Sequence, residues 1–335
     1  MVRRKIGIVY NDPKPDRYGS MGEDKAVIGV LEGVAAVHQA LDELGYEVVE
    51  VPLLPPYERA RDALKAIGTD LAFNLFEGFG GRPKTEATVA KMLSELGFTH
   101  TGCSSTALAL ALDKAKAKDL MQSHGISTPK YQLVTPETVS QFQLSYPCIV
   151  KPCGEDASHG LSADSVVHNQ ESLERQVTTV SRAFGGKALV EEFVGGREFN
   201  ATVMGNDEAT VLPVSEIVYS LPPGMPRILT YAGKWEEGTP YFDGTKVICP
   251  AEIGDEERTQ LVQTAMAVFR LLVQRGYARV DMRLDPDGKI QVLEVNPNPD
   301  ITPGSGAARQ AAAASMTYAQ FIEKILSLAL HRKTT

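Results

Sequence analysis

Residues 279–296 have the sequence RVDMRLDPDGKIQVLEVN, in which two runs of alternating polar and apolar residues flank an Asp-Gly pair. Alternation of this kind predicts two half-buried strands, and Asp-Gly between them predicts a hairpin. A two-residue turn at 287–288 would place Asp281 directly opposite Glu294. A four-residue loop would shift the register by two residues, yet Asp281, Glu294 and Asn296 would still share one face, because side chains alternate with period two.

The same register places Arg279 opposite Asn296, so the polar face carries two carboxylates, an amide and a guanidinium. Mg²⁺ prefers such oxygen ligands and completes its shell with water and phosphates. A buried acidic pair also needs a positive partner. The alternative is a solvated polar face with a chance asparagine, but the other face is entirely apolar. Its members are Val280, Met282, Leu293 and Val295.

Two further stretches carry polar groups suited to a nucleotide. A buried strand over 148–152 ends near Lys151 and precedes a small-residue loop, 154–160, that includes Ser158. Backbone N–H groups of such a loop can bind a phosphate while the lysine supplies charge, although this is not a Walker A loop. A strand over 189–193 leads into an irregular bend that can present backbone groups and a glutamate to an adenine. Ordinary surface loops and solvated strand ends are the alternatives.

Around these stretches the chain divides into an α/β part and two mixed parts. Strands and helices alternate in the first third, which predicts a parallel sheet covered by helices. The predicted strands are 5–10, 47–51 and 70–76, and the predicted helices are 26–44 and 85–96. A helix over 113–125, short strands and glycine-rich turns then indicate a small mixed subdomain. Strands dominate from residue 208, with helices at 255–275 and 318–331, and the long segment 221–244 is typical of a lid.

Composition excludes several classes of protein. The 335 residues include 34 Lys and Arg against 42 Asp and Glu, a net charge of −8, which disfavours nucleic acid and anionic membranes as partners. The longest apolar runs, such as 107–112, are too short for a bilayer, and the N-terminus lacks a signal-peptide pattern. A cytoplasmic protein is expected. The four cysteines lack metal or disulfide spacing, and the glycine-rich 304–309 lacks the third glycine of a dinucleotide motif.

Several motifs together resemble those of the ATP-grasp carboxylate–amine ligases and, among these, the D-alanine–D-alanine ligase family. They are Phe73–Gly81, Thr101–Cys103, Leu112–Lys114, Ile149–Pro152, Arg279–Asp281, Leu293–Asn296 and Ala307–Gln310. The resemblance covers nearly the whole chain. It implies an α/β three-domain ATP-grasp fold: an N-terminal Rossmann-like parallel sheet (1–106), a small central α+β subdomain (107–196) and a C-terminal mixed α+β domain (197–335). Homodimers through the N-terminal domain are common in the family, so a homodimer is an expectation.

The resemblance also implies which residues bind ATP and metal. The phosphate-facing residues are Lys114, Lys151, Ser158 and the lid lysine Lys234. The adenine and ribose contacts are Glu191, Phe193, Val194 and Glu198. The ligands of two Mg²⁺ ions, or of Mn²⁺, are Asp281, Glu294 and Asn296. Arg279 matches the arginine that stabilises charged intermediates, and Lys234 and Ser158 complete the implied catalytic set.

The implied reaction joins the carboxylate of one amino acid to the amine of another through an acyl phosphate, as in synthesis of a peptidoglycan precursor. The amino-acid pocket departs from the family pattern. Its candidate residues are Glu77 in place of a histidine, Trp235 in place of a lid tyrosine, Asp300 and Ser305, with Glu23 as a donor-site candidate and Ala157 in place of a serine. The loop after Asn296 is about three residues shorter than usual. The alternatives are a ligase of a specialised pathway, a nucleotide-binding regulatory protein, and a metal-dependent enzyme without ATP.

Overall fold

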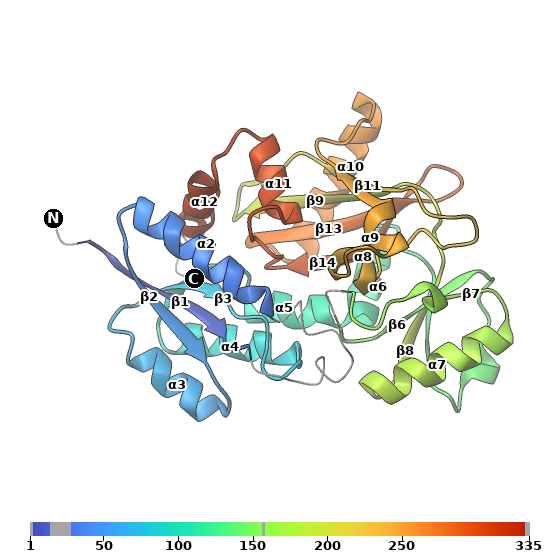
Figure 1. Ribbon diagram of the computed structural model, residues 1–335, viewed down its shortest axis with the longest axis horizontal. Coiled ribbons are helices and arrows are strands. Elements are labelled where there is room, and N and C mark those ends of the chain that lie inside the picture. Colours follow the sequence, from blue (N-terminus) through green and yellow to red (C-terminus); the bar gives the residue numbers. More distant parts are fainter. Residues whose placement is uncertain (1–2, 14–27, 156–157, 332–335) are drawn as a thin grey trace.

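The computed structural model describes residues 3–13, 28–155 and 158–331. The N-terminal part is a parallel sheet in the order β2-β1-β3-β4 (Figure 1). Its strands are β1 (Lys5–Asn11), β2 (Glu47–Leu53), β3 (Leu71–Leu75) and β4 (Thr99–His100), and its helices are α2 (Val30–Glu43), α3 (Tyr57–Lys65) and α4 (Lys84–Glu95). The predicted α/β alternation is confirmed. The start predicted for the first helix, Ala26, lies outside the described residues, and α3 was not predicted.

Glycines end α2 and α4 as predicted. Gly45 and Gly97 follow these helices with φ of 85° and 80°, in the left-handed region that a side chain disfavours. The chain can therefore turn sharply back into β2 and β4. Because glycines mark the ends of these two helices, the alternation of strands and helices could be predicted from the first third of the sequence.

The central part is an antiparallel sheet in the order β5-β8-β6-β7. Its strands are β5 (Tyr131–Val134), β6 (Cys148–Pro152), β7 (Val166–Val167) and β8 (Ala188–Glu192), with short 3₁₀ turns at Val139–Gln141 and Ala163–Ser165. The amphipathic helix α7 (Gln170–Phe184) covers one face and begins at a capping box formed by Asn169 and Ser172. Helix α7 is absent from the sequence prediction, although Leu173, Val177 and Val180 show helical spacing.

The third sheet has the order β12-β11-β9-β13-β14, with β10 paired to β9. Its strands are β9 (Glu198–Gly205), β10 (Ala209–Val211), β11 (Ser215–Tyr219), β12 (Thr245–Ile248), β13 (Gly276–Leu284) and β14 (Ile290–Pro297). One face is apolar and packs against α5 (Ser105–Leu112), α6 (Lys114–Ser123) and α10 (Asp255–Leu272). Side chains alternate along the strands, so the opposite face of β9 and β13 carries the polar residues.

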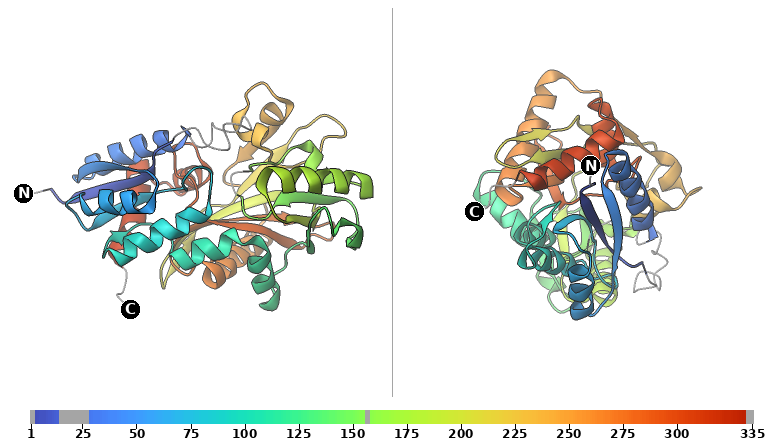
Figure 2. Two further views of the ribbon diagram at one scale, coloured as in Figure 1. Left: turned by 90° about the horizontal axis from the view of Figure 1, so that it is seen from below. Right: turned by 90° about the vertical axis from the view of Figure 1, so that its left-hand side faces the viewer.

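The last two helices join the N-terminal sheet to this large sheet. Helices α11 (Gly306–Ala313) and α12 (Tyr318–Leu330) share one hydrophobic cluster with Ile6, Ile8, Met204 and Tyr277. Figures 1 and 2 show the central sheet with α7 at the opposite end of the molecule from the N-terminal sheet. Packing thus crosses the predicted boundaries: α5 and α6 cover the large sheet, and α12 contacts α2.

The β13–β14 hairpin has the predicted pairs but not the predicted turn. Asp281 lies opposite Glu294, and Arg279 lies opposite Asn296. Near the turn, however, Leu284 pairs with Ile290, a register that would place residue 293 opposite Asp281.

A three-residue loop and a compensating bulge account for this difference. The Asp285 N–H donates to the Lys289 carbonyl (2.9 Å), and Gly288 has φ of 78°. This resembles the common three-residue hairpin loop with a left-handed glycine. Leu293 is the extra residue of a β-bulge, so Val292 rather than Leu293 is buried opposite Met282. The prediction that Leu293 belongs to the apolar face was therefore wrong.

Candidate active site

The predicted metal ligands and Arg279 lie together on the polar face of β13 and β14. The Arg279 guanidinium donates to both oxygens of Asp281, with Nε–Oδ1 at 2.7 Å and Nη2–Oδ2 at 2.8 Å. Asn296 Nδ2 donates to Asp281 Oδ2 at 2.9 Å and, more weakly, to Glu294 Oε1 at 3.4 Å. Lys114 Nζ lies 3.0 Å from Glu294 Oε2. Residues from one helix and two strands therefore meet within hydrogen-bonding distance.

The charges of this group are balanced by their neighbours. Burial alone would raise the pKa of Glu294, but Lys114 and Lys151 outweigh it and hold that pKa well below its usual range. Burial raises the pKa of Asp281, against the opposing effect of Arg279. The pKa of Arg279 is raised because Asp281 outweighs the cost of burial. Arg279 and Lys114 are thus positive partners for the partly buried acidic pair.

The donor set fits a hard divalent cation. Asp281 and Glu294 provide carboxylate oxygens opposite each other across the hairpin, and Asn296 provides an amide beside them. Mg²⁺ takes such ligands together with phosphate oxygens and water. In the described part of the chain, no cluster of three or more His, Cys, Asp or Glu side chains is placed to hold a metal.

A second charged group lies on the central sheet. Glu191 at the end of β8 is fully buried and bridges two lysines, with Oε1 2.5 Å from Lys118 Nζ and Oε2 2.6 Å from Lys151 Nζ. Lys118 also donates to Thr128 Oγ1 at 2.6 Å. Burial alone would raise the pKa of Glu191, but the two lysines hold it at about 2, whereas burial lowers the pKa of Lys118.

Lys118 was missed as a site residue. Its signal was its position four residues after Lys114 on one helix, because residues at this spacing share a helix face. Lys151, predicted to face phosphates, instead lies against the predicted adenine contact Glu191 in this structure.

Arg283 and Tyr219, which bond to predicted nucleoside contacts, were not among the predicted residues. Tyr219 Oη donates to Glu198 Oε2 at 2.6 Å, and the Arg283 guanidinium donates to the same oxygen. Arg283 Nη1 donates to the Val194 carbonyl at 2.7 Å, and its guanidinium lies 5.6 Å from the centre of the Phe193 ring. The signal for Arg283 was present in the sequence, since it alternates with Arg279 and Asp281 along β13.

The predicted lid contains two short helices, α8 (Tyr231–Trp235) and α9 (Pro240–Gly244), capped by threonines. It lies against the predicted phosphate loop: the Tyr231 ring lies 5.6 Å from that of His159, and the Tyr231 N–H donates to the carbonyl of Leu161, just after the loop (3.4 Å). Lys234 and Trp235 belong to α8. In the loop, Ser158 has φ of 63°, a conformation that non-glycine residues adopt mainly at special sites.

The predicted amino-acid residues come from three segments, with Trp235 in α8, Glu77 after β3, and Asp300 and Ser305 in one loop. Glu77 is exposed after β3, and its N–H donates to Asn11 Oδ1 at 3.0 Å. Asp300 Oδ1 accepts from the Thr302 N–H at 2.8 Å, and Ser305 Oγ donates to the Asp300 carbonyl at 2.8 Å. Ser305 is also the N-cap of α11. Glu23 and Ala157 lie outside the described residues.

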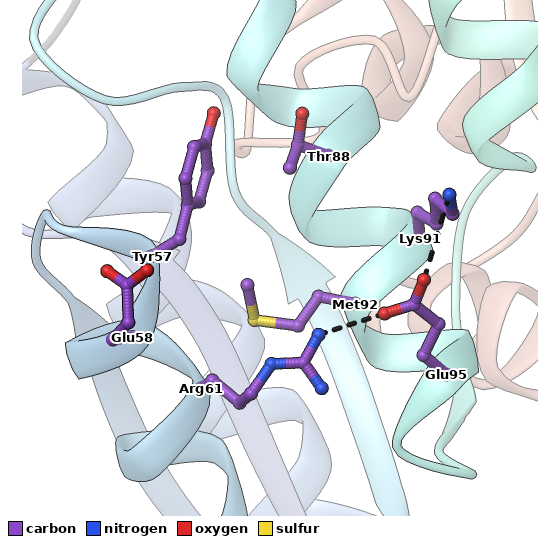
Figure 3. Close-up of a pocket in the computed structure, with 7 residues that line it drawn as sticks. All are labelled: Tyr57, Glu58, Arg61, Thr88, Lys91, Met92 and Glu95. Carbon is purple, nitrogen blue, oxygen red and sulfur yellow. Dashed lines mark hydrogen bonds and ion pairs between the residues drawn. The ribbon is translucent and has the colours of Figure 1, made fainter.

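Two surface hollows differ in their relation to this site. One of about 650 Å³ is bordered by Phe193, Val194, Lys130 and Glu192, at the connection from β8 to β9. The other, of about 290 Å³, lies between α3 and α4 (Figure 3). It contains no predicted site residue, and the Arg61–Glu95 pair (2.9 Å) bridges its two helices. The α3–α4 hollow is therefore separate from the predicted site residues. Within residues 3–13, 28–155 and 158–331, each helix is too short or too polar to span a bilayer.

Comparisons with known proteins agree with the fold and the motifs. Residues 120–327 match the family model described as "D-ala D-ala ligase C-terminus". The uncharacterized protein y4sG of Sinorhizobium fredii is 34% identical over 89% of this chain and 87% of its own length. A D-alanine–D-alanine ligase of Desulfotalea psychrophila is 30% identical over 90% of each chain.

Solved structures show the same fold at lower identity. A Bacillus anthracis D-alanine–D-alanine ligase complexed with ATP has a TM-score of 0.75 at 21% identity, covering 98% of each chain. The VanG D-Ala:D-Ser ligase of Enterococcus faecalis has a TM-score of 0.74 at 20% identity, covering 98% of this chain and all of its own. Fold and motifs define an ATP-grasp carboxylate–amine ligase, an ATP-dependent enzyme that forms amide bonds between small molecules. The chain belongs to the D-alanine–D-alanine ligase family.

Proposed function

We propose that this protein joins two amino acids in the cytoplasm and that the polar face of β13 and β14 is where the reaction occurs. The observation that carries the proposal is the meeting of Arg279, Asp281, Glu294 and Asn296 with Lys114 on one sheet face. In the reaction, the carboxylate of the first amino acid attacks the γ-phosphorus of ATP, giving an acyl phosphate and ADP. The amine of the second attacks the acyl carbon and releases phosphate, completing the amide.

Each part of the site has a proposed task. Lys114, Lys151, Ser158 and the lid residue Lys234 bind the phosphates; Glu191, Phe193 and Val194 face the base; Glu198 faces the ribose. Asp281, Glu294 and Asn296 would hold two Mg²⁺ ions, which neutralise phosphate charge when bound. Arg279 stabilises negative charge that develops on the reacting groups, a contribution typically of roughly 3 kcal/mol for one well-placed donor. The lid keeps water from the acyl phosphate.

The arrangement into domains 1–106, 107–196 and 197–335 is also proposed, with ATP between the second and third. The three sheets support this division. A homodimer through the first domain is a prediction that light scattering can test.

D-alanine is the first substrate to examine, because several relatives are named D-alanine–D-alanine ligase. The product of that reaction would be a peptidoglycan precursor. The acceptor is the open point. VanG is named for D-Ala:D-Ser ligation, so acceptors differ among proteins of this fold. Here Asp300 and Ser305 bond within their own loop, and that loop is short. We propose that the acceptor is an amino acid other than D-alanine.

The test is ADP release over a matrix of D- and L-amino-acid pairs, with mass spectrometry of the products. We expect one pair to give a dipeptide, and ¹⁸O from the donor carboxylate to appear in the released phosphate. Arg279→Ala should lose most turnover while still binding ATP. ADP release with no dipeptide from any pair would contradict the proposal. D-alanyl-D-alanine as the best product would contradict only the acceptor assignment.

A further inference from the structure

Arg283 is a buried arginine that connects three segments of the chain. The residue is only 3% exposed, yet its guanidinium donates to a partner on each of three segments of the chain. On β9 it donates to Glu198 Oε2, with Nε at 3.0 Å. In the β8–β9 connection it donates to the Val194 carbonyl at 2.7 Å, and at the start of the lid it donates to the Arg227 carbonyl.

The sheet register explains this position. Arg283 lies directly opposite Glu198 in the β9–β13 pair, and opposed residues of paired strands interact across the face. It shares that face with Arg279 and Asp281, at the end of the row nearest the central sheet. The rings of Phe193 and Tyr219 lie 5.6 and 5.7 Å from the guanidinium. The side chain is therefore fixed by aromatic packing as well as by hydrogen bonds.

These contacts orient the Glu198 carboxylate. Arg283 and Tyr219 both donate to Oε2, so one oxygen takes all the bonds that the structure gives this carboxylate among the described residues. The other oxygen, Oε1, is left to accept a ligand hydroxyl. A charge-assisted bond to a correctly oriented carboxylate is stronger than a neutral one, so the orientation of Glu198 determines how well a sugar hydroxyl binds.

We propose that Arg283 is a positioning residue that couples the nucleoside site to the lid. It holds Glu198 for the ribose hydroxyls and Val194 for the base, and through the Arg227 carbonyl it holds the entry of the lid. The inference rests on the proposed function, because Glu198 and Val194 are nucleoside contacts only there. A nucleotide with an intact ribose diol would thus both bind the carboxylate and stabilise the lid.

The chain offers a direct probe of the lid, since its single tryptophan, Trp235, lies in α8. The experiment titrates the full chain with a non-hydrolysable ATP analogue and Mg²⁺ while following Trp235 fluorescence. We expect a saturable change in the unmodified protein. In Arg283→Met, the Kd should rise by roughly tenfold or more and the fluorescence change at saturation should shrink, because charged hydrogen bonds are lost. Arg283→Lys should be intermediate.

A second measurement separates positioning from a general structural role. The ratio of kcat/KM for ATP to that for 2′-deoxy-ATP should fall severalfold in Arg283→Met, because Glu198 is no longer oriented toward the 2′-hydroxyl. A merely structural defect would lower both values alike and would overturn the proposal.

Arg197→Met is the matched control. Arg197 forms a bidentate pair with Glu216 at 2.7 Å and contacts Glu257 of α10, so it lies on the face of the sheet away from the site. This variant should keep the Kd, the nucleotide ratio and the fluorescence change.

The remaining outcomes also test the proposed role of Arg283. If Arg283→Met fails to fold because Glu198 is left unpaired, Arg283→Met with Glu198→Gln removes that charge and should show the same loss of lid response. An unchanged lid response and nucleotide ratio in a folded Arg283 variant would overturn the inference while the proposed function stands. Absence of any nucleotide binding by the unmodified protein would overturn the proposed function and this inference together.

Discussion

The two ends of the polar face of β13 are built differently. At the proposed nucleotide end, defined here by Lys114, Lys118, Lys151, Glu191, Glu198, Asp281, Arg283 and Glu294, most charged side chains pair across separate elements, and Asp281 pairs with Arg279 of its own strand. At the acceptor end, defined by the loop 297–306, the bonds of Asp300 and Ser305 are made within the loop itself. One end is cross-linked by ion pairs, and the other is shaped mainly by local turns and a helix cap.

The difference indicates which properties can change independently. Moving one charged group at the nucleotide end leaves a buried partner uncompensated, which costs several kcal/mol, so substitutions there are strongly constrained. The acceptor loop can change length or sequence without exposing such a partner. We infer that the ATP-dependent step is fixed by the sheets, whereas the choice of acceptor is set by a loop that can vary.

Asp281→Asn should give the largest effect and tests the nucleotide end directly. The change keeps the shape but removes the charge that pairs with Arg279 and would bind a cation. Loss of one electrostatic contribution of this kind typically lowers kcat by roughly 100- to 1,000-fold. ADP release under saturating substrates measures it. Asp287→Asn, on the exposed turn of the same hairpin, is the control and should behave as the unmodified protein. Activity within a factor of about five of normal in Asp281→Asn would remove the basis of the comparison.

The Glu191 pair gives a smaller effect that depends on pH. The pKa of Glu191 is held at about 2 against an ordinary 4.5. Its depressed pKa means that the carboxylate stabilises the fold above about pH 4.5, and that this stabilisation is lost as pH falls toward 2. Between about pH 4.5 and 3 the loss is roughly 2 kcal/mol in the free energy of unfolding.

Urea unfolding at about pH 5 and about pH 3 measures this term. The double variant Lys118→Met with Glu191→Gln removes the pair without leaving Lys118 buried and unpaired, and should show a flatter decline. Glu192→Gln, at the partly exposed end of the same strand, should leave the decline unchanged. Equal slopes in the unmodified and double-variant proteins would mean that this pair does not stabilise the nucleotide end.

The sequence predicted the shared faces of strand residues better than the turns and helices between them. Asp281, Glu294 and Asn296 share one face as predicted, because the bulge at Leu293 restores the register that the three-residue loop shifts by one residue. The predicted turn was wrong because the loop has an odd number of residues and a bulge at Leu293 compensates for it. The alternation of polar and apolar residues does not reveal such a bulge. Helix α7 shows that even a clear helical pattern was overlooked among short strands.

Long-range partners were beyond sequence reasoning. The helix face on which Lys118 lies could be predicted from the sequence. Its partner Glu191, however, lies on β8 of the central sheet, far along the chain. The same holds for Arg283. Its strand face could be predicted from its alternation with Arg279 and Asp281, but its contacts with Val194 and the lid could not. Periodicity gives a side chain's face, whereas its partner depends on how the sheets pack.

Asn298 is the exception that sharpens the comparison, because it ties the acceptor loop to the N-terminal part. It has φ of 50°, and its Oδ1 accepts from the Cys103 N–H at 2.7 Å. Its Nδ2 donates to Glu86 Oε1 at 3.1 Å. Asparagine suits this position, since it tolerates the left-handed region and carries both a donor and an acceptor.

Loss of these two bonds should loosen the loop and leave the nucleotide end intact. In Asn298→Gly the backbone conformation stays accessible, so the side chain alone is tested. We expect the KM for the best acceptor to rise roughly tenfold, as for loss of about 1.4 kcal/mol, while the KM for ATP stays the same. Asn298→Ala should be somewhat worse, because alanine disfavours positive φ. Initial rates against acceptor and against ATP separate the two constants. A parallel rise in both would mean that the loop and the nucleotide end are one coupled unit, and the division between fixed and variable ends would fail.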